Sequence, residues 1–121
     1  MAVIRIVEDD AFILTIAEMM IQDWGHTTLS AVDEAEALVF LKAPGRIDAL
    51  FTDIYLRTSV LGGCTLAAEA MSLRHDLRVL YTTGNSITEA MKGLFVSGAR
   101  CLCKPYTELQ LQDSLEGLLA A

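Results

Sequence analysis

The stretch Ile4-Arg5-Ile6-Val7-Glu8-Asp9-Asp10 decides the fold of this 121-residue chain. Its apolar part is rich in β-branched residues and ends in three acids, which is typical of a buried strand, here Ala2–Val7, that stops at a polar edge. Apolar residues then recur at helical spacing until Gly25 provides a stop, so we predict a helix over Ala11–Trp24. That spacing is carried by Phe12, Ile16, Met19 and Met20.

The same alternation of a short apolar run and a helical pattern repeats along the rest of the chain. The expected strands are Thr27–Ala31, Asp48–Thr52, Arg78–Thr82 and Arg100–Cys103, and the expected helices are a segment capped by Asp33 and ending at Leu41, then Cys64–Leu73, Ser86–Val96 and Thr107–Leu119. Strands that alternate with helices predict an α/β fold, a doubly wound five-stranded parallel sheet with helices on both faces. Periodicity alone leaves the strand order open.

Size and composition restrict the class of protein. A chain of 121 residues makes one domain, residues 1–121, large enough for a core without disulfides. The net charge is −7 and the nine basic residues are scattered, which argues against direct contact with nucleic acid. The chain lacks both the roughly 18-residue apolar run of a membrane span and the pattern of a signal peptide. We therefore expect a cytoplasmic protein that does not enter the membrane.

The three cysteines are Cys64, Cys101 and Cys103. Their odd number and their spacing give no disulfide framework. Cys101-x-Cys103 resembles half of a zinc site, but His26 and His75 are the only other strong nitrogen ligands, so a four-ligand site is not expected. We expect buried thiols without a metal.

Polar residues follow the predicted strands at the points where these strands end. Glu8 and Asp9 come after the first strand, Asp53 ends the third, Thr83 follows the fourth and Lys104 follows the fifth. Ligands of such sheets bind outside the carboxyl ends of the strands, so all of these side chains are expected on one rim.

Three carboxylates on one rim repel one another unless a cation lies among them. Glu8, Asp9 and Asp53 therefore predict a divalent ion with oxygen ligands, and Mg²⁺ is the usual one where phosphate is involved. The alternative is an acidic helix start, in which Asp9 or Asp10 caps Ala11–Trp24.

An acid at the end of an apolar strand is a helix cap, a salt-bridge partner or a reactive group. Beside a divalent ion, Asp53 could attack a phosphoryl group in line and form an aspartyl phosphate. Thr83 and Lys104 could then bind the new oxygens, and the proline in Lys104-Pro105 keeps the lysine extended. A turn threonine and a solvated loop lysine are the alternatives for these two residues.

The sequence resembles the CheY-like receiver domain of two-component response regulators. The similarity rests on four stretches in the family's order: Ile4-Arg5-Ile6-Val7-Glu8-Asp9-Asp10, Leu50-Phe51-Thr52-Asp53-Ile54, Val79-Leu80-Tyr81-Thr82-Thr83-Gly84, and Gly98-Ala99-Arg100 through Lys104-Pro105-Tyr106. The resemblance implies the flavodoxin-like strand order 2-1-3-4-5. It also implies a regulatory phosphoacceptor rather than an enzyme, without an output domain in this chain.

The resemblance further implies roles for individual residues. Mg²⁺ would be held by Glu8 through water, by Asp9 and Asp53 directly, and by the main-chain carbonyl of Tyr55, while Thr83 and Lys104 would sense the phosphoryl group. The implied phosphodonors are a sensor histidine kinase, a histidine phosphotransfer protein or a small phosphodonor. Output to a target protein or a homodimer partner would use the face formed by the fourth helix, fifth strand and fifth helix, including Cys101 and Tyr106.

Three departures from the family bear on output. The loop with Arg57-Thr58-Ser59-Val60-Leu61-Gly62-Gly63 lacks the usual proline and is longer than the common form. Cys101 stands where an aromatic residue or histidine is usual, and Cys103 stands where an apolar residue is usual. None of the departures removes an expected ligand.

Other functions fit the sequence less well. A phosphohydrolase with an aspartate nucleophile typically carries Asp-x-Asp, whereas Asp53-Ile54-Tyr55 has no second acid. A flavodoxin-like FMN protein needs a phosphate loop after the first strand, and the acids there would repel phosphate. A receiver-like module that is never phosphorylated is disfavoured by the intact set of acids together with Thr83 and Lys104.

Overall fold

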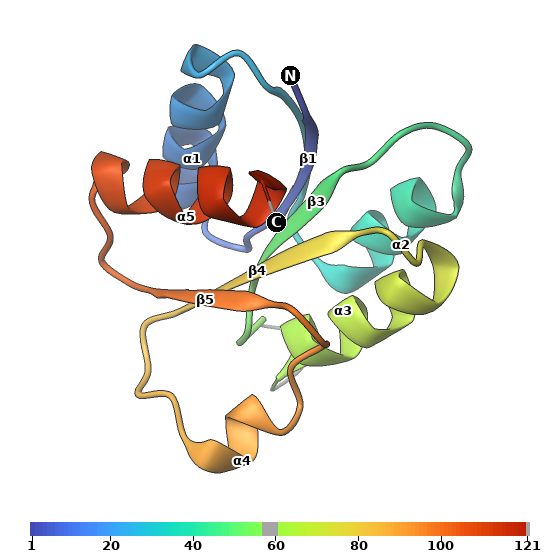
Figure 1. Cartoon of the computed structure of the whole chain (residues 1–121), viewed down its shortest axis with the longest axis vertical. Coiled ribbons are helices and arrows are strands. Elements are labelled where there is room, and N and C mark those ends of the chain that lie inside the picture. Colours follow the sequence, from blue (N-terminus) through green and yellow to red (C-terminus); the bar gives the residue numbers. More distant parts are fainter. Residues whose placement is uncertain (57–60, 121) are drawn as a thin grey trace.

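The computed structural model describes residues 1–56 and 61–120 (Figure 1). Its elements are β1 (Val3–Val7), α1 (Ala11–Asp23), β2 (Thr27–Ala31), α2 (Glu34–Lys42), β3 (Ala49–Asp53), α3 (Gly62–Leu73), β4 (Arg78–Thr83), α4 (Glu89–Lys92), β5 (Arg100–Cys103) and α5 (Glu108–Ala120). All paired strands are parallel, and their order is β2-β1-β3-β4-β5. The predicted doubly wound fold and its implied strand order are confirmed.

The sheet has a core cluster on each face. Helices α1 and α5 cover one face, where Ile4, Phe51 and Leu80 point, and α2 and α3 cover the other, where Leu50 and Tyr81 point (Figure 1). Neighbouring residues of a strand point to opposite faces, so near-continuous apolar strands fill both clusters. Among the described residues, no helix has the length and apolarity needed to cross a bilayer.

Side-chain caps fix the starts of the first two helices. The Asp10 carboxylate accepts hydrogen bonds from the backbone N–H of Phe12 (2.9 Å) and of Ile13 (3.2 Å). Asp33 does the same for Glu36 (2.8 Å) at the start of α2. Both caps agree with the sequence, because Asp supplies an acceptor for the unpaired N–H groups of a first turn.

The fourth helix is much shorter than predicted. We expected Ser86–Val96, but α4 covers only Glu89–Lys92. The Thr88 hydroxyl caps it by accepting from the Met91 N–H at 3.1 Å, and Gly93 follows its last residue. A later cap and an early glycine shorten the helix, because glycine is a poor helix former.

The apolar residues whose spacing predicted helix α1 are not the ones that it buries. Its buried residues are Leu14, Ala17 and Ile21, whereas Phe12 is 74% and Met19 is 61% exposed. The helix therefore carries apolar residues on two sides, and periodicity alone does not say which side meets the sheet.

The thiol prediction holds only in part. Cys64 is buried, Cys101 is half-buried and Cys103 is exposed, so Cys103 contradicts it. Cys103 lies on the last strand of the sheet, where α2 and α3 no longer provide cover (Figure 1).

The fourth strand is one residue longer than predicted, so Thr83 ends β4 instead of following it. The unusual loop residues at positions 57–60 lie outside the described residues.

Candidate functional site

The carboxyl ends of the strands bring the polar side chains singled out in the sequence to one rim. Asp53 ends β3 and Thr83 ends β4, while Glu8 follows β1 and Lys104 follows β5. Oxygen atoms from Glu8, Asp9 and Asp53, one from each, lie within 4.8 Å of one another. Glu8 and Asp53 are only 4% and 6% exposed. Three carboxylates so placed fit a hard divalent cation that prefers oxygen ligands.

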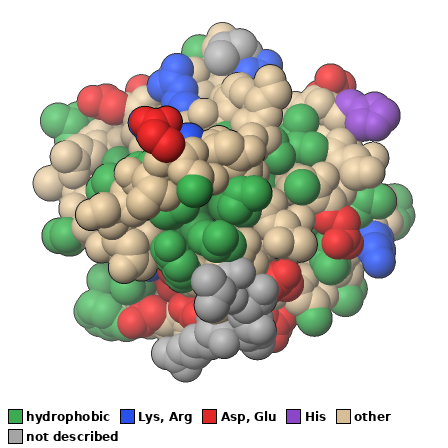
Figure 2. Space-filling view, turned by 90° about the horizontal axis from the view of Figure 1, so that it is seen from below, with side chains coloured by type: hydrophobic (Ala, Val, Ile, Leu, Met, Phe, Trp, Pro, Cys, Tyr) green, Lys and Arg blue, Asp and Glu red, His purple; other side chains and the backbone are tan. Residues whose placement is uncertain are grey.

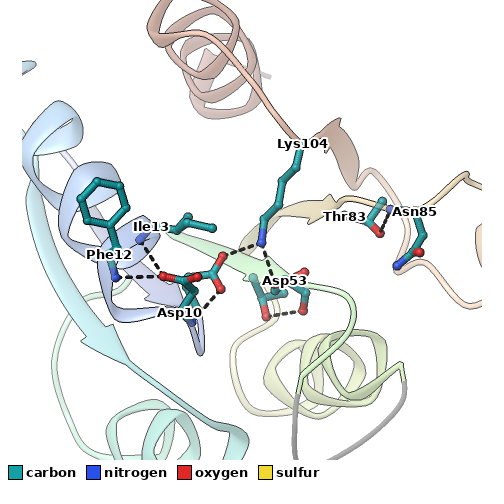
Figure 3. A network of polar contacts seen from close by, with 9 residues as sticks. Asp10, Phe12, Ile13, Asp53, Thr83, Asn85 and Lys104 are labelled. Atoms are coloured by element: carbon teal, nitrogen blue, oxygen red, sulfur yellow. Dashed lines mark hydrogen bonds and ion pairs between the residues drawn. The ribbon is translucent and has the colours of Figure 1, made fainter.

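Lys104 lies between two of these acids (Figure 3). Its Nζ atom is 2.7 Å from Glu8 Oε1 and 2.8 Å from Asp53 Oδ2. Burial alone would lower the pKa of Lys104, but the hydrogen bonds that it donates to Asp53 and Glu8 outweigh this effect and raise the pKa above its usual value. Lys104 therefore stays charged and neutralises part of the acidic rim.

Glu8 and Asp10, in the same acidic run, have different contacts. The second Glu8 oxygen accepts a hydrogen bond from the Asp10 N–H at 3.0 Å, while the Asp10 side chain caps α1. Burial raises the pKa of Glu8, and its hydrogen bonds to Lys104 and Asp10 only partly oppose that rise. The cap interpretation of the acidic run is therefore confirmed for Asp10. Glu8 and Asp9 lie close to Asp53 instead, and a metal ion held by these three acids stays a prediction.

Gly63 supports the backbone of Asp53 and was missed in the sequence. A Cβ atom at position 63 would collide with the carbonyl group of Asp53 and crowd Ile54 Cα. The Gly63 N–H also donates to the Ile54 carbonyl at 2.9 Å. Only glycine allows the first turn of α3 to approach β3 so closely. The pair Gly62-Gly63 at a helix start was the available signal.

Thr83 lies on the same rim but bonds elsewhere. Its buried hydroxyl accepts from the Asn85 N–H at 3.0 Å, to one side of the carboxylates (Figure 3). Its carbonyl accepts from the Lys104 N–H at 2.8 Å, which joins the two strand ends. A rotation of the threonine side chain would be needed to bring its hydroxyl toward a group on Asp53.

The remaining candidates lie around this centre. Tyr55 is half-buried and its hydroxyl is 3.7 Å from Met91 Sδ, whereas the role of its main-chain carbonyl stays a prediction. Cys101 packs against the core cluster beneath α2 and α3. Tyr106 packs edge-to-face on Phe51, with ring centres 6.1 Å apart. Burial, and then the charge of Glu8, raise the pKa of Tyr106.

An apolar groove opens beside the acidic rim. It has a volume of about 510 Å³ and is lined by Phe12, Ile13, Ile16, Met20, Gly84, Lys104, Pro105 and Tyr106. The groove joins the exposed side of α1 to the segment after β5. The groove was not predicted, because the helical spacing of Phe12 and Ile16 does not say whether they are buried or exposed.

Comparison with known proteins gives a consistent result. Residues 4–116 match the model of the response regulator receiver domain. A response regulator receiver protein from Sinorhizobium medicae is 26% identical, with a TM-score of 0.90 over 99% of this chain and 95% of that one. The chemotaxis protein CheY4 of Vibrio cholerae is 23% identical, with a TM-score of 0.85 over 98% and 99% of the two chains. The receiver domain of the hybrid histidine kinase CckA is 24% identical, with a TM-score of 0.81 over 97% and 98%.

Proposed function

The chain belongs to the response regulator receiver domain family, the regulatory domains of two-component signalling, and from this premise we propose that Asp53 is the phosphoacceptor of a signalling switch. One observation carries the proposal. The Asp53 carboxylate is buried at the rim, bound by Lys104 at 2.8 Å and grouped with the carboxylates of Glu8 and Asp9. Lys104 holds this carboxylate and offers a positive charge to an incoming phosphoryl group, and a divalent ion at the three acids would offset their repulsion.

The chemistry is transfer of a phosphoryl group to a carboxylate oxygen. An oxygen of Asp53 attacks phosphorus, the bond from phosphorus to the donor breaks, and the leaving group keeps the electron pair. When bound, Mg²⁺ would offset the negative charge on the transferring group. Asp9 and Asp53 would hold the ion directly, Glu8 through water, and Tyr55 through its main-chain carbonyl. The chain is thus a regulatory substrate that assists its own phosphorylation, rather than an enzyme with a separate substrate.

Lys104 and Thr83 would act after transfer. A phosphoryl group on Asp53 offers acceptor oxygens to the Lys104 ammonium, which already contacts this carboxylate. Thr83 would exchange its contact with the Asn85 N–H for a bond from its hydroxyl to the phosphoryl group. Contacts that exist only in the phosphorylated state shift the population toward a second conformation.

Two surfaces, which share Tyr106, suit two kinds of partner. The apolar groove beside α1 is lined in part by Lys104, whose ammonium contacts Asp53, so we assign the groove to the phosphodonor, a histidine kinase or histidine phosphotransfer protein. The output surface would be α4, β5 and α5, which could bind a target or a second copy of the chain. Figure 2, viewed from the side on which α4 lies, shows apolar side chains gathered near the centre of that face. Leu94, just after α4, is 50% exposed.

Intact-mass measurement tests the phosphoacceptor. With acetyl phosphate and Mg²⁺, the wild type should gain one phosphoryl group and Asp53→Asn should gain none. Asp23→Asn, at the exposed end of α1, is the matched control and should be labelled like the wild type. Labelling of Asp53→Asn at the wild-type level would refute the assignment. If Asp9→Asn is labelled normally at limiting Mg²⁺, the metal site lies elsewhere.

A further inference from the structure

Tyr81 connects the core of β4 to the segment that follows α4. Its side chain is fully buried, and its ring stacks on Phe95 with ring centres 4.4 Å apart and planes 27° apart. Its hydroxyl oxygen accepts a hydrogen bond from the Val96 N–H at 3.1 Å. A residue of the central sheet therefore holds two consecutive residues of a surface segment.

The held segment, residues 94–98, is otherwise secured by local turns. Within the described residues, its backbone hydrogen bonds run from the N–H of Leu94 to Met91 and from the N–H of Phe95 to Lys92, while the Ala99 N–H donates to Val96. Helix α4 contributes little rigidity, because it spans only Glu89–Lys92. In the part of the chain that the structure describes, the Tyr81 hydroxyl is thus the polar contact that fixes this segment to the sheet.

Tyr81 also lies on the same strand as Thr83, a residue of the proposed switch. It precedes Thr83 by two residues on the same strand, so the two side chains point to the same face. Residues 84–99 join Thr83 to β5 and hence to Lys104. Tyr81 pairs with Cys101, whose side chain is small and half-buried, so the rings of Tyr81 and Phe95 supply the bulk at this point.

We propose that Tyr81 is a latch that holds residues 94–98 in the resting position and opposes closure of the switch. This inference rests on the proposed function. When Thr83 and Lys104 turn toward a phosphorylated Asp53, the segment between them must move. The Tyr81 oxygen is fixed in the core, so the Val96 N–H leaves it during that movement. The hydrogen bond therefore stabilises the resting state more than the closed one.

A structural role without a latch is the competing explanation. A buried tyrosine hydroxyl normally finds a hydrogen-bond partner, and such a bond can stabilise both states equally. Burial raises the pKa of Tyr81 to about 12, so its hydroxyl stays protonated near neutral pH. Only the difference between the two states separates a latch from a purely structural contact.

Tyr81→Phe makes the separation, because it keeps the ring and the stack on Phe95 and removes only the hydroxyl. In the resting protein, without Mg²⁺ or beryllofluoride, amide exchange at Val96 and its neighbours should become faster. With Mg²⁺, the apparent affinity for beryllofluoride, which mimics the phosphoryl group, should rise about two- to tenfold, the range expected for one hydrogen bond lost from the resting state alone.

Ile4→Val is the matched control. It removes one buried methylene from β1 on the face covered by α1 and α5, so it lowers stability away from the latch. Its beryllofluoride affinity should equal that of the wild type.

The outcomes separate the two proposals. Unchanged affinity in Tyr81→Phe, or unchanged exchange at Val96, would overturn the latch while leaving phosphorylation intact. A wild type that does not respond to beryllofluoride would overturn the proposed function and, with it, the latch.

Discussion

Lys104 shows most directly how single residues set the resting state of the site. Its ammonium group donates to Glu8 and Asp53, two carboxylates that are almost completely buried. Charges in such a place are costly unless they are paired and hydrogen-bonded. The resting protein thus uses a lysine for part of the charge compensation that a divalent ion would supply.

Replacing Lys104 tests that compensation. Lys104→Met keeps most of the apolar stem but leaves Glu8 and Asp53 without their shared cation, so the free energy of unfolding should fall by about 3 kcal/mol without Mg²⁺. Mg²⁺ should then stabilise the variant more than the wild type, because it no longer meets the lysine charge. Urea unfolding with and without Mg²⁺ measures both effects.

The control for this measurement is Lys92→Met. Lys92 is exposed and pairs with Glu89 at 3.5 Å, an ion pair that contributes little. Its stability should change only slightly, and its response to Mg²⁺ should match that of the wild type. A Lys104→Met protein that is as stable as the wild type without Mg²⁺ would show that the bridge does not compensate the acids.

At the scale of elements, local chemistry was predictable and the choice between competing faces was not. Asp10 and Asp33 indicated where α1 and α2 begin, because a capping side chain bonds to N–H groups only two or three residues ahead of it in the chain. In α1, however, Phe12 and Ile16 are four residues apart, as are Ala17 and Ile21, and only packing against the sheet decides which pair is buried. Gly63 escaped notice because its contact, the backbone of Asp53, is formed only once α3 packs on β3.

For the site, too, residues placed by the strand ends were predictable and contacts formed by packing were not. The strand ends located Glu8, Asp9, Asp53 and Lys104, because parallel strands place their carboxyl ends on one rim whatever their order. The groove beside α1 and the aromatic pair of Tyr81 and Phe95 depend on side-chain packing between distant segments. No spacing rule in the sequence encodes contacts of that kind.

Arg74 binds the end of α2, and its replacement gives a prediction at the scale of elements. Its guanidinium donates to the carbonyls of Leu41 (3.0 Å), Ala43 (2.7 Å) and Gly45 (2.6 Å). These carbonyls lie at or beyond the end of the helix, where they lack helical partners. Arg74→Met should lower the free energy of unfolding by about 2 kcal/mol, since charge-assisted hydrogen bonds are lost. Urea unfolding checks this value.

A charge effect alone must be separated from the loss of this fork of donors. Lys42→Met removes a positive charge from the last turn of the same helix and should cost less than about 1 kcal/mol. Equal losses in the two variants would mean that charge near the helix end, rather than hydrogen bonding by Arg74, stabilises this part of the molecule.

At the scale of the whole molecule, the two helical layers give the sheet two differently used sides. One layer, with α1 and α5, brings an apolar groove against the acidic rim, and the α4 side carries the segment held by Tyr81 (Figure 1). The acids lie at the carboxyl ends of β1 and β3, between these two surfaces. Input at the groove and output at α4 and β5 would let a phosphodonor and a target respond to the same carboxylate from different surfaces, which meet at Tyr106 and α5.

That arrangement predicts a split between protein and small phosphodonors. Phe12 lines the groove and is 74% exposed, so Phe12→Ser should leave the core intact while removing a large apolar contact for a docking protein. Transfer from a histidine phosphotransfer protein that labels the wild type should slow about tenfold or more, the effect of losing one central apolar anchor. Labelling by acetyl phosphate should not change, because a small phosphodonor needs only the acidic rim. Val39→Ser, which alters a 67% exposed side chain on α2 in the other layer, should match the wild type with both donors. Equal slowing with both donors would place the effect of Phe12 in the chemistry at Asp53, and no slowing with the protein donor would move its docking surface away from α1.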